Sequence, residues 1–211
     1  MYSELVDTLR CLNPHEDSWL VAAADLTEGR HILRGMLGCP ICHARYPISD
    51  GIADFTGGAR RPVELEPERG DFGEDDALKL AAMLDLTTPA GYVLLVGRWA
   101  RLAGRLRELA PVTVLAVNAP PDVVMGDGIS GVVTGDRIPV AAGSARGAAL
   151  DAARDVLVAS AVAALRAGGR IVGEASIPDP DDVTIVARDD RHWVGTRRAD
   201  GPLLQLVRSP G

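Results

Sequence analysis

The sequence is poor in lysine, cysteine and aromatic residues. Lys79 is the single lysine among 22 basic residues, only three cysteines are present, and aromatic side chains make up 4%. The net charge of −7 argues against the broad basic surface that displaces counterions from nucleic acid, so no nucleic-acid partner is expected. Three cysteines cannot all pair in disulfides, which favours metal or redox chemistry in a reducing compartment.

Long apolar runs and a targeting segment are also missing. The longest apolar run, residues 156–165, is about half of the roughly 20 residues that span a bilayer. The first ten residues carry acids and lack an apolar stretch, so no signal peptide is expected. These absences predict a cytoplasmic protein with no membrane span. Peripheral association with a membrane through a partner protein stays open.

One abrupt change in composition divides the chain. Residues 62–76 hold seven acids, two prolines and two glycines, which is typical of a solvated linker; a docking segment for a basic partner is the alternative. The sequence therefore predicts a small module at 1–61, an acidic linker at 62–76 and a second domain at 77–211. The first module has too few large apolar side chains for an independent core, so a staple is expected.

Apolar runs and helical patterns alternate in the second domain. Helical spacing predicts helices over 77–86, 100–109 and 154–169, the last capped by Gly168 and Gly169. Short runs predict strands over 91–97, 112–118, 131–136, 146–152, 170–176, 183–189 and 202–208. The alternation predicts an α/β fold, in which a Rossmann-like, mostly parallel sheet carries helices on both faces and follows a small β module.

Cys39 and Cys42 form a C-x-x-C knuckle, and a tetrahedral zinc needs two further ligands. Cys11 and His15, with three residues between them, supply these ligands upstream. Residues 19–37 would provide strands that bring the two pairs together. All four coordination positions would then be filled by protein, which predicts a structural zinc site.

Three alternatives stay open for this site. The C-x-x-C could be a redox pair, although no thioredoxin-like strand and helix surround it. The module could have lost its metal and be held by apolar contacts. His31 and His43 lie close enough in the sequence to replace His15 as the fourth ligand.

The stretch "LRCLNPHED…GCPICHARYPISDGIADF" resembles the Trm-type zinc-ribbon family, the small activating subunit of tRNA and translation-factor methyltransferases. The resemblance covers about residues 5–56. The matching residues are Cys39, Cys42, Tyr46, Pro47, Ile48, Asp50, Gly51 and Ile52. The chain departs from the family in the wider gap from Cys11 to His15 and in Ala53, where the family has proline. The resemblance implies a module that binds and stabilises methyltransferase domains, often by lending a strand edge, and here it is expected to pack on its own second domain.

The order of elements from residue 77 to 208 resembles the class I, S-adenosylmethionine-dependent methyltransferase fold. The best local match is 161–175, which is similar to the family's helix, Gly-Gly turn and strand; 135–140 is similar to its acidic turn after the third strand. The resemblance implies cofactor-binding roles for three positions, one after each of the first three strands. These are Gly97, Asn118 and Asp136.

Two of these positions depart from what the cofactor needs. The family usually has G-x-G after the first strand, but here Gly97 precedes Arg98 and Trp99, which would fill the place of the cofactor's methionine portion. Asn118 offers one acceptor oxygen and no charge where a carboxylate would accept from both ribose hydroxyls. No catalytic base or nucleophile is evident, and Asp151 is interpreted as a solvated acid near a helix start.

These features favour a non-catalytic accessory or scaffold protein that contains structural zinc, binds a protein partner and is not expected to use S-adenosylmethionine. The alternatives are an active methyltransferase with an unusual cofactor loop and a module that binds an altered small ligand. The partner surface is expected to include residues 187–201, because Trp193 and the arginines around it are residue types enriched at binding hot spots. Trp193 could instead pack a terminal hairpin.

Overall fold

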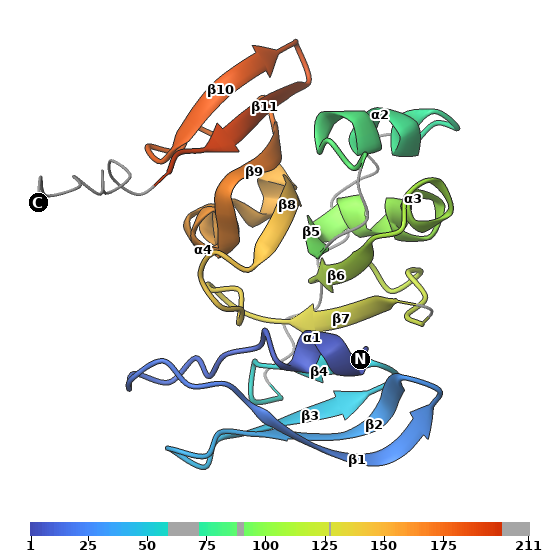
Figure 1. Ribbon diagram of the computed structural model, residues 1–211, viewed down its shortest axis with the longest axis vertical. Helices are drawn as coiled ribbons and strands as arrows, with labels where there is room; N and C mark the ends of the chain where they lie inside the picture. The colour runs from blue at the N-terminus through green and yellow to red at the C-terminus, as the bar shows by residue number, and fades with distance from the viewer. Residues whose placement is uncertain (59–71, 88–90, 127, 200–211) are drawn as a thin grey trace, which may run out of the picture.

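The computed structural model describes residues 1–58, 72–87, 91–126 and 128–199, and their strands form one continuous sheet (Figure 1). The strands are β1 (Val21–Glu28), β2 (His31–Gly38), β3 (Arg45–Ser49), β4 (Ile52–Asp54), β5 (Tyr92–Val96), β6 (Thr113–Val117), β7 (Ile129–Val133), β8 (Ala145–Leu150), β9 (Leu165–Glu174), β10 (Val183–Arg188) and β11 (His192–Arg197). The helices are α1 (Ser3–Val6), α2 (Asp76–Met83), α3 (Ala103–Leu109) and α4 (Val158–Ala164), with 3-10 helices η1 (Gly97–Leu102) and η2 (Ala152–Leu157). Within the described ranges, no helix combines the length and apolar character needed to cross a membrane.

The strand order fixes where a ligand would be expected. The sheet runs β1-β2-β3-β4-β7-β6-β5-β8-β9-β11-β10, and the pairings from β4 to β9 are parallel. From β5 the chain moves to β6 and β7 on one side and then returns to β8 on the other. In open α/β sheets, ligands bind outside the carboxyl ends of the strands at such a switch point. The crevice at the switch point therefore lies after β5 and β8.

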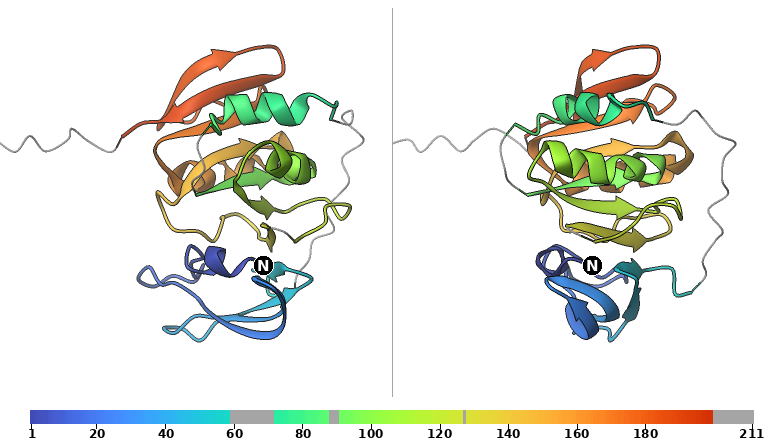
Figure 2. Two further views of the ribbon diagram at one scale, coloured as in Figure 1. Left: turned by 45° about the vertical axis from the view of Figure 1, so that its right-hand side comes forward. Right: turned by 90° about the vertical axis from the view of Figure 1, so that its right-hand side faces the viewer.

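Helices cover both faces of the parallel sheet, as the sequence predicted (Figure 2). All five residues of β5 are buried, and their alternation divides them between two cores. Val93 and Leu95 pack in the core that contains residues of α2 and α3, whereas Leu94 and Val96 pack in the core that contains residues of α4. Burial on both faces explains why this strand is uniformly apolar. The fold is a mixed α/β, Rossmann-like fold with a mostly parallel central sheet.

The small β module joins this sheet directly. β4 pairs in parallel with β7, with Ile52 opposite Gly131 and Asp54 opposite Val133. Around the pairing, the Phe55 N–H donates to the Val133 carbonyl at 2.8 Å. Apolar residues of β2 and β3 share one core with residues of β5 and β6. The module therefore needs no separate apolar core, because it completes one with the second domain.

The third predicted helix ends earlier than its glycine pair suggested. α4 ends at Ala164, and Gly168 and Gly169 lie inside β9. The pairing of β8 with β9 shifts register here, from Ala145 opposite Leu165 to Gly147 opposite Arg170. A Cβ at Gly169 would lie 2.9 Å from the Arg146 carbonyl oxygen, so this glycine permits a close backbone approach, and neither glycine caps a helix.

The segment expected to bind a partner contains a buried strand. Trp193 of β11 is fully buried, and its indole N–H donates to the Ile177 carbonyl at 3.0 Å. Gly173 lies opposite Trp193 on β9, where a Cβ would approach the indole ring to 2.3 Å. The placement of Trp193 on a binding surface is therefore wrong, and its alternative role in a terminal hairpin is correct.

Two predicted segments lie wholly or partly outside the described residues. The strand predicted over 202–208 is one of them, and residues 62–71 of the predicted linker are the other. The remainder of that linker is described: the Phe72 ring centroid lies 5.2 Å from that of Trp99, and Asp76 is the first residue of α2.

Candidate functional site

The four predicted metal ligands lie together at one end of the small module. The ligand atoms of Cys11, His15, Cys39 and Cys42 all lie within 4.8 Å of one another. The turn between β2 and β3 presents Cys39 and Cys42, and this turn is tightened by the His43 N–H, which donates to the Cys39 carbonyl at 3.0 Å. Neither His31 nor His43 belongs to the cluster, so His15 is the imidazole that the fold selects.

The spacing of the donor atoms fits a tetrahedral zinc ion. Two thiolates bound to one zinc at about 2.3 Å lie about 3.8 Å apart, and an imidazole nitrogen lies slightly closer to a thiolate. The sulfurs of Cys11 and Cys42 are 3.6 Å apart, and the Cys39 sulfur lies 3.4 Å from Nε2 of His15. Around a bound zinc, three sulfurs and one nitrogen would fill the coordination shell and leave no position for water, as in structural sites.

Groups around the cluster shift the pKa values of its thiols in opposite directions. The N–H of Ala44 is the main cause that lowers the pKa of Cys42 to about 6, and the Asn13 amide supports it by donating to the sulfur at 3.2 Å. Burial raises the pKa of Cys11, whereas the Tyr46 hydroxyl 3.2 Å away opposes that rise. His15 Nδ1 lies 2.6 Å from the Glu16 carbonyl, which fixes the tautomer that leaves Nε2 free to bind metal.

The crevice after β5 and β8 is filled by the protein itself. Gly97 begins η1 with φ of 61°, and Trp99 follows with 3% of its surface exposed. The Trp99 indole N–H donates to the carbonyl of Leu150, the last residue of β8, at 3.1 Å. The side chain expected to occupy the cofactor's position is therefore anchored across the switch point, from the turn after β5 to the end of β8.

Asp151 closes the same turn from the opposite strand. One carboxylate oxygen accepts the Arg98 N–H and the other accepts the Ala153 N–H, each at 3.0 Å. A Cβ at Gly97 would lie 2.4 Å from the first of these oxygens, so only glycine leaves room for the carboxylate. Asp151 caps η2, as predicted, but it is 8% exposed and is not the solvated acid that the sequence suggested.

Glu174, at the end of β9, is a site residue that sequence reasoning missed. It is 7% exposed, accepts the Ala152 N–H at 3.2 Å and pairs with the Arg98 guanidinium at 3.3 Å. The available signal was its position as the first charged residue after the apolar run 171–173. A carboxylate there indicates a buried partner, because an unpaired buried charge is costly.

The other two predicted cofactor positions follow the next two strands: Asn118 comes directly after β6, whose last residue Val117 lies opposite Val96, and Asp136 follows β7. The Asn118 side chain is committed to the backbone of Thr134: its amide donates to the carbonyl at 3.0 Å, and its oxygen accepts the N–H at 2.9 Å. This contact ties the end of β6 to the loop after β7. Asp136 lies exposed in that loop. Asn118 thus uses its one acceptor oxygen on the protein.

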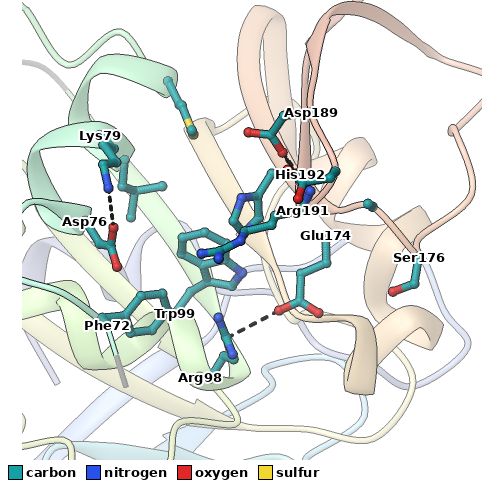
Figure 3. A pocket seen from close by; sticks show the side chains of 14 residues that line it. Phe72, Asp76, Lys79, Arg98, Trp99, Glu174, Ser176, Asp189, Arg191 and His192 are labelled. Atoms are coloured by element: carbon teal, nitrogen blue, oxygen red, sulfur yellow. Dashed lines mark hydrogen bonds and ion pairs between the residues drawn. The ribbon is translucent and has the colours of Figure 1, made fainter. Parts of the chain in front are cut away.

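A cleft with a volume of about 800 Å³ borders the other side of Trp99, between α2 and the turn joining β10 to β11 (Figure 3). The rings of Phe72 and His192 each lie with their centroids 5.2 Å from that of Trp99. The Arg98 guanidinium lies over the Phe72 ring at 4.8 Å. Aromatic side chains thus line the part of the cleft next to the closed turn.

The charges in the cleft largely compensate one another. A hydrogen bond from Lys79 at 2.9 Å lowers the pKa of Asp76, and the N–H groups of His192 and Arg191 lower the pKa of Asp189. Glu174 and Arg98 form a second ion pair, in addition to that of Asp76 and Lys79. Charged side chains and aromatic rings thus line this cleft, and the imidazole of His192 and the carboxylate of Asp190 are among them.

No family profile matches the sequence, and no curated protein matches it either. Solved structures are similar to it. One is the complex between the Haloferax volcanii Trm112 methyltransferase activator and a methyltransferase, at 10% identity and a TM-score of 0.44, over 59% of this chain and 92% of that one. Another is an RNA methyltransferase from Salinibacter ruber bound to S-adenosyl-L-homocysteine, at 14% identity and a TM-score of 0.43, over 66% of this chain and 100% of that one. A TehB-like SAM-dependent methyltransferase from Corynebacterium glutamicum has 17% identity and a TM-score of 0.40, over 57% of this chain and 86% of that one.

Proposed function

We propose that this chain is a non-catalytic accessory protein, in which a zinc-ribbon module at 1–61 is joined through the linker at 62–76 to a methyltransferase-like domain at 77–211. The observation that carries the proposal is the closed turn after β5. Trp99 and Asp151 fill the switch-point crevice and are held there by hydrogen bonds to Leu150 and Arg98. A bound cofactor would have to displace buried, hydrogen-bonded groups, which costs free energy that an open glycine-rich turn does not require.

The cluster of three cysteines and one histidine supports structural zinc in this protein. Its role would be to hold the turn between β2 and β3 against the segment around Cys11, so that β4 is presented to β7. Free thiol ligands persist in a reducing compartment, which supports a cytoplasmic location. Bound zinc would supply folding free energy and no catalytic water, because all four of its positions are taken by protein side chains.

A partner protein would find accessible apolar side chains on the ribbon. Trp19 and Val21 expose 64% and 57% of their surface, and β1 forms one end of the sheet. A sheet edge offers unpaired N–H and C=O groups to an incoming strand, and exposed tryptophan is enriched at binding hot spots. Trp19 replaces Trp193 as the side chain we expect a partner to contact.

Calorimetry with S-adenosylmethionine tests the loss of the cofactor site. We expect a dissociation constant above roughly 1 mM, which corresponds to less than about 4 kcal/mol of binding free energy. Micromolar binding by the full chain would overturn the proposal.

The partner surface is tested by comparing Trp19→Asp with Leu109→Asp. Leu109 lies on α3 and is 52% exposed, so it is a matched apolar-to-acid control on another element. Partners recovered from native cells should be lost only with Trp19→Asp, while both variants keep the wild-type unfolding midpoint. A wild-type chain that elutes alone would exclude the scaffold role, and equal recovery by both variants would exclude the ribbon edge.

An active methyltransferase with an unusual cofactor loop is the second candidate. The cleft of about 800 Å³ beside Trp99 favours it, since small-molecule sites have volumes in this range. This candidate predicts tight binding of S-adenosylmethionine in the same calorimetry, so one measurement separates the two functions.

A further inference from the structure

A groove on the face opposite α2 has the composition of a binding site for a peptide segment. It has a volume of about 490 Å³ and lies between η2 and α4 on one side and the connection from β9 to β10 on the other. Its apolar lining residues are Val156, Val158, Ala159, Val162, Ile177, Pro178 and Pro180. Val156 is 57% exposed, so apolar surface is open to an occupant.

Acidic residues surround this apolar surface. They are Asp155, Asp179, Asp181 and Asp182. Asp179 pairs with Arg188 of β10, and the other three are exposed. An occupant that matches the groove therefore combines several apolar side chains with a positive charge.

The described chain ends beside this groove. The Arg198 N–H donates to the Asp182 carbonyl at 2.9 Å, and its guanidinium donates to the Val183 carbonyl at 3.4 Å. Asp182 lines the groove, so the chain leaves β11 at the groove's rim. From Ala199, the four residues to Leu203 span up to about 14 Å when extended, which is enough to enter the groove.

The sequence that follows has the required chemistry. Residues 202–208 read PLLQLVR, with Leu203, Leu204, Leu206 and Val207 as large apolar side chains and Arg208 as the only charge. Four such side chains within five positions favour burial over exposure to water. Arg208 would compensate the aspartates at the rim.

We propose that residues 202–208 of the same chain occupy the groove between α4 and the connection from β9 to β10. The apolar side chains would cover Val156, and Arg208 would face the aspartates. This inference is independent of the state of the cofactor turn and of the partner surface on β1.

Hydrogen exchange measured by mass spectrometry on the full chain tests the proposal. We expect the amides of 203–208 to exchange at least tenfold more slowly than an unstructured chain. Val156→Asp should abolish this protection, whereas Val186→Asp should leave it unchanged. Val186 is a matched control, because it is 51% exposed and lies on β10 outside the groove. Unaltered protection of β5 would verify that each variant is folded.

The reciprocal variant, Leu204→Asp, should accelerate exchange at residues 177–182 and leave β5 unchanged. Unprotected amides at 203–208 in the wild-type chain would overturn the proposal, and so would equal effects of Val156→Asp and Val186→Asp. Protection that falls on tenfold dilution would assign the groove to the tail of a second copy and would also overturn it.

Discussion

Asp151 joins two segments that the chain order keeps 53 residues apart, because its carboxylate accepts the Arg98 N–H in addition to capping η2. The contact requires Gly97, whose missing Cβ leaves space for the carboxylate. At the scale of single residues, the closed turn therefore depends on a glycine that follows β5 and an acid that follows the neighbouring strand β8.

Replacing Asp151 with alanine should destabilise the protein. The change removes the acceptor for two N–H groups, one of which begins η2, and should cost about 1–3 kcal/mol in free energy of unfolding. Urea denaturation measures the change. Asp155→Ala is the control, since Asp155 is exposed and lies in the same 3-10 helix; its effect should stay within about 0.5 kcal/mol. Equal losses in the two variants would contradict the proposed role of Asp151.

Tyr92 makes stability sensitive to alkaline pH. Burial is the main cause that raises its pKa above the ordinary value of 10.0, and its hydroxyl lies 2.6 Å from Ser144 Oγ. The folded protein therefore retains this proton at a pH where the unfolded chain loses it. Stability should be constant in this respect below about pH 10 and fall as the pH rises above it.

Unfolding midpoints of the wild type and Tyr92→Phe, measured from pH 8 to 11, test this prediction. Because the variant lacks the hydrogen bond to Ser144, its free energy of unfolding at pH 8 should be about 1 kcal/mol lower than that of the wild type. Above pH 10, however, its free energy of unfolding should decline less steeply. Parallel curves would show that Tyr92 does not contribute to the alkaline loss.

At the scale of elements, the pairing of β4 with β7 decides how the small β module joins the rest of the sheet. Gly131 lies opposite Ile52, and a Cβ there would lie 2.8 Å from Ile52 Cγ1 and 3.2 Å from Met125 Sδ. The two strands can approach only because this position lacks a side chain.

Gly131→Ala should therefore cost about 1–3 kcal/mol through overpacking at the junction. Gly135→Ala is the matched control, because a Cβ there meets nothing within 4 Å; its effect should be small. Chemical denaturation measures both. Adding Ile52→Ala should relieve the clash, so the double variant should lose less than the sum of the single losses. Additive losses would contradict a clash between these two residues.

At the scale of the whole molecule, one sheet and one shared core couple the ribbon to the second domain. Loss of a metal at Cys39 and its neighbours should therefore destabilise more than the ribbon. Binding only the folded state stabilises a protein by mass action, and that contribution disappears with the ion.

Chelation should lower the thermal midpoint of the entire chain in one cooperative transition, and added zinc should restore it. Tryptophan fluorescence in a Trp19→Phe background reports on Trp99 and Trp193, both buried outside the ribbon. A fluorescence midpoint unchanged by chelation, while zinc is shown to be released, would contradict the coupling. Cys39→Ser should reproduce the effect of chelation without a chelator.

The local features of this chain were determined by its sequence. Apolar runs located β5 and β6, and helical spacing of apolar residues located α2 and α3, because burial on both faces or on one face imposes a pattern on the order of residue types. The spacing of Cys11, His15, Cys39 and Cys42 predicted a cluster that the fold assembles. These predictions succeed because they depend on side-chain type and short-range spacing.

Tertiary structure decided what depends on contacts between distant segments. Gly169 was assigned, with Gly168, to a helix end because its role, close approach to the Arg146 backbone, involves another strand. The burial of Trp193 depends on Gly173, and that of Asp151 depends on Gly97. In the last two cases a glycine on another segment makes room for a large or charged side chain. A missing Cβ has no periodicity, so only the folded chain shows which side chain it admits.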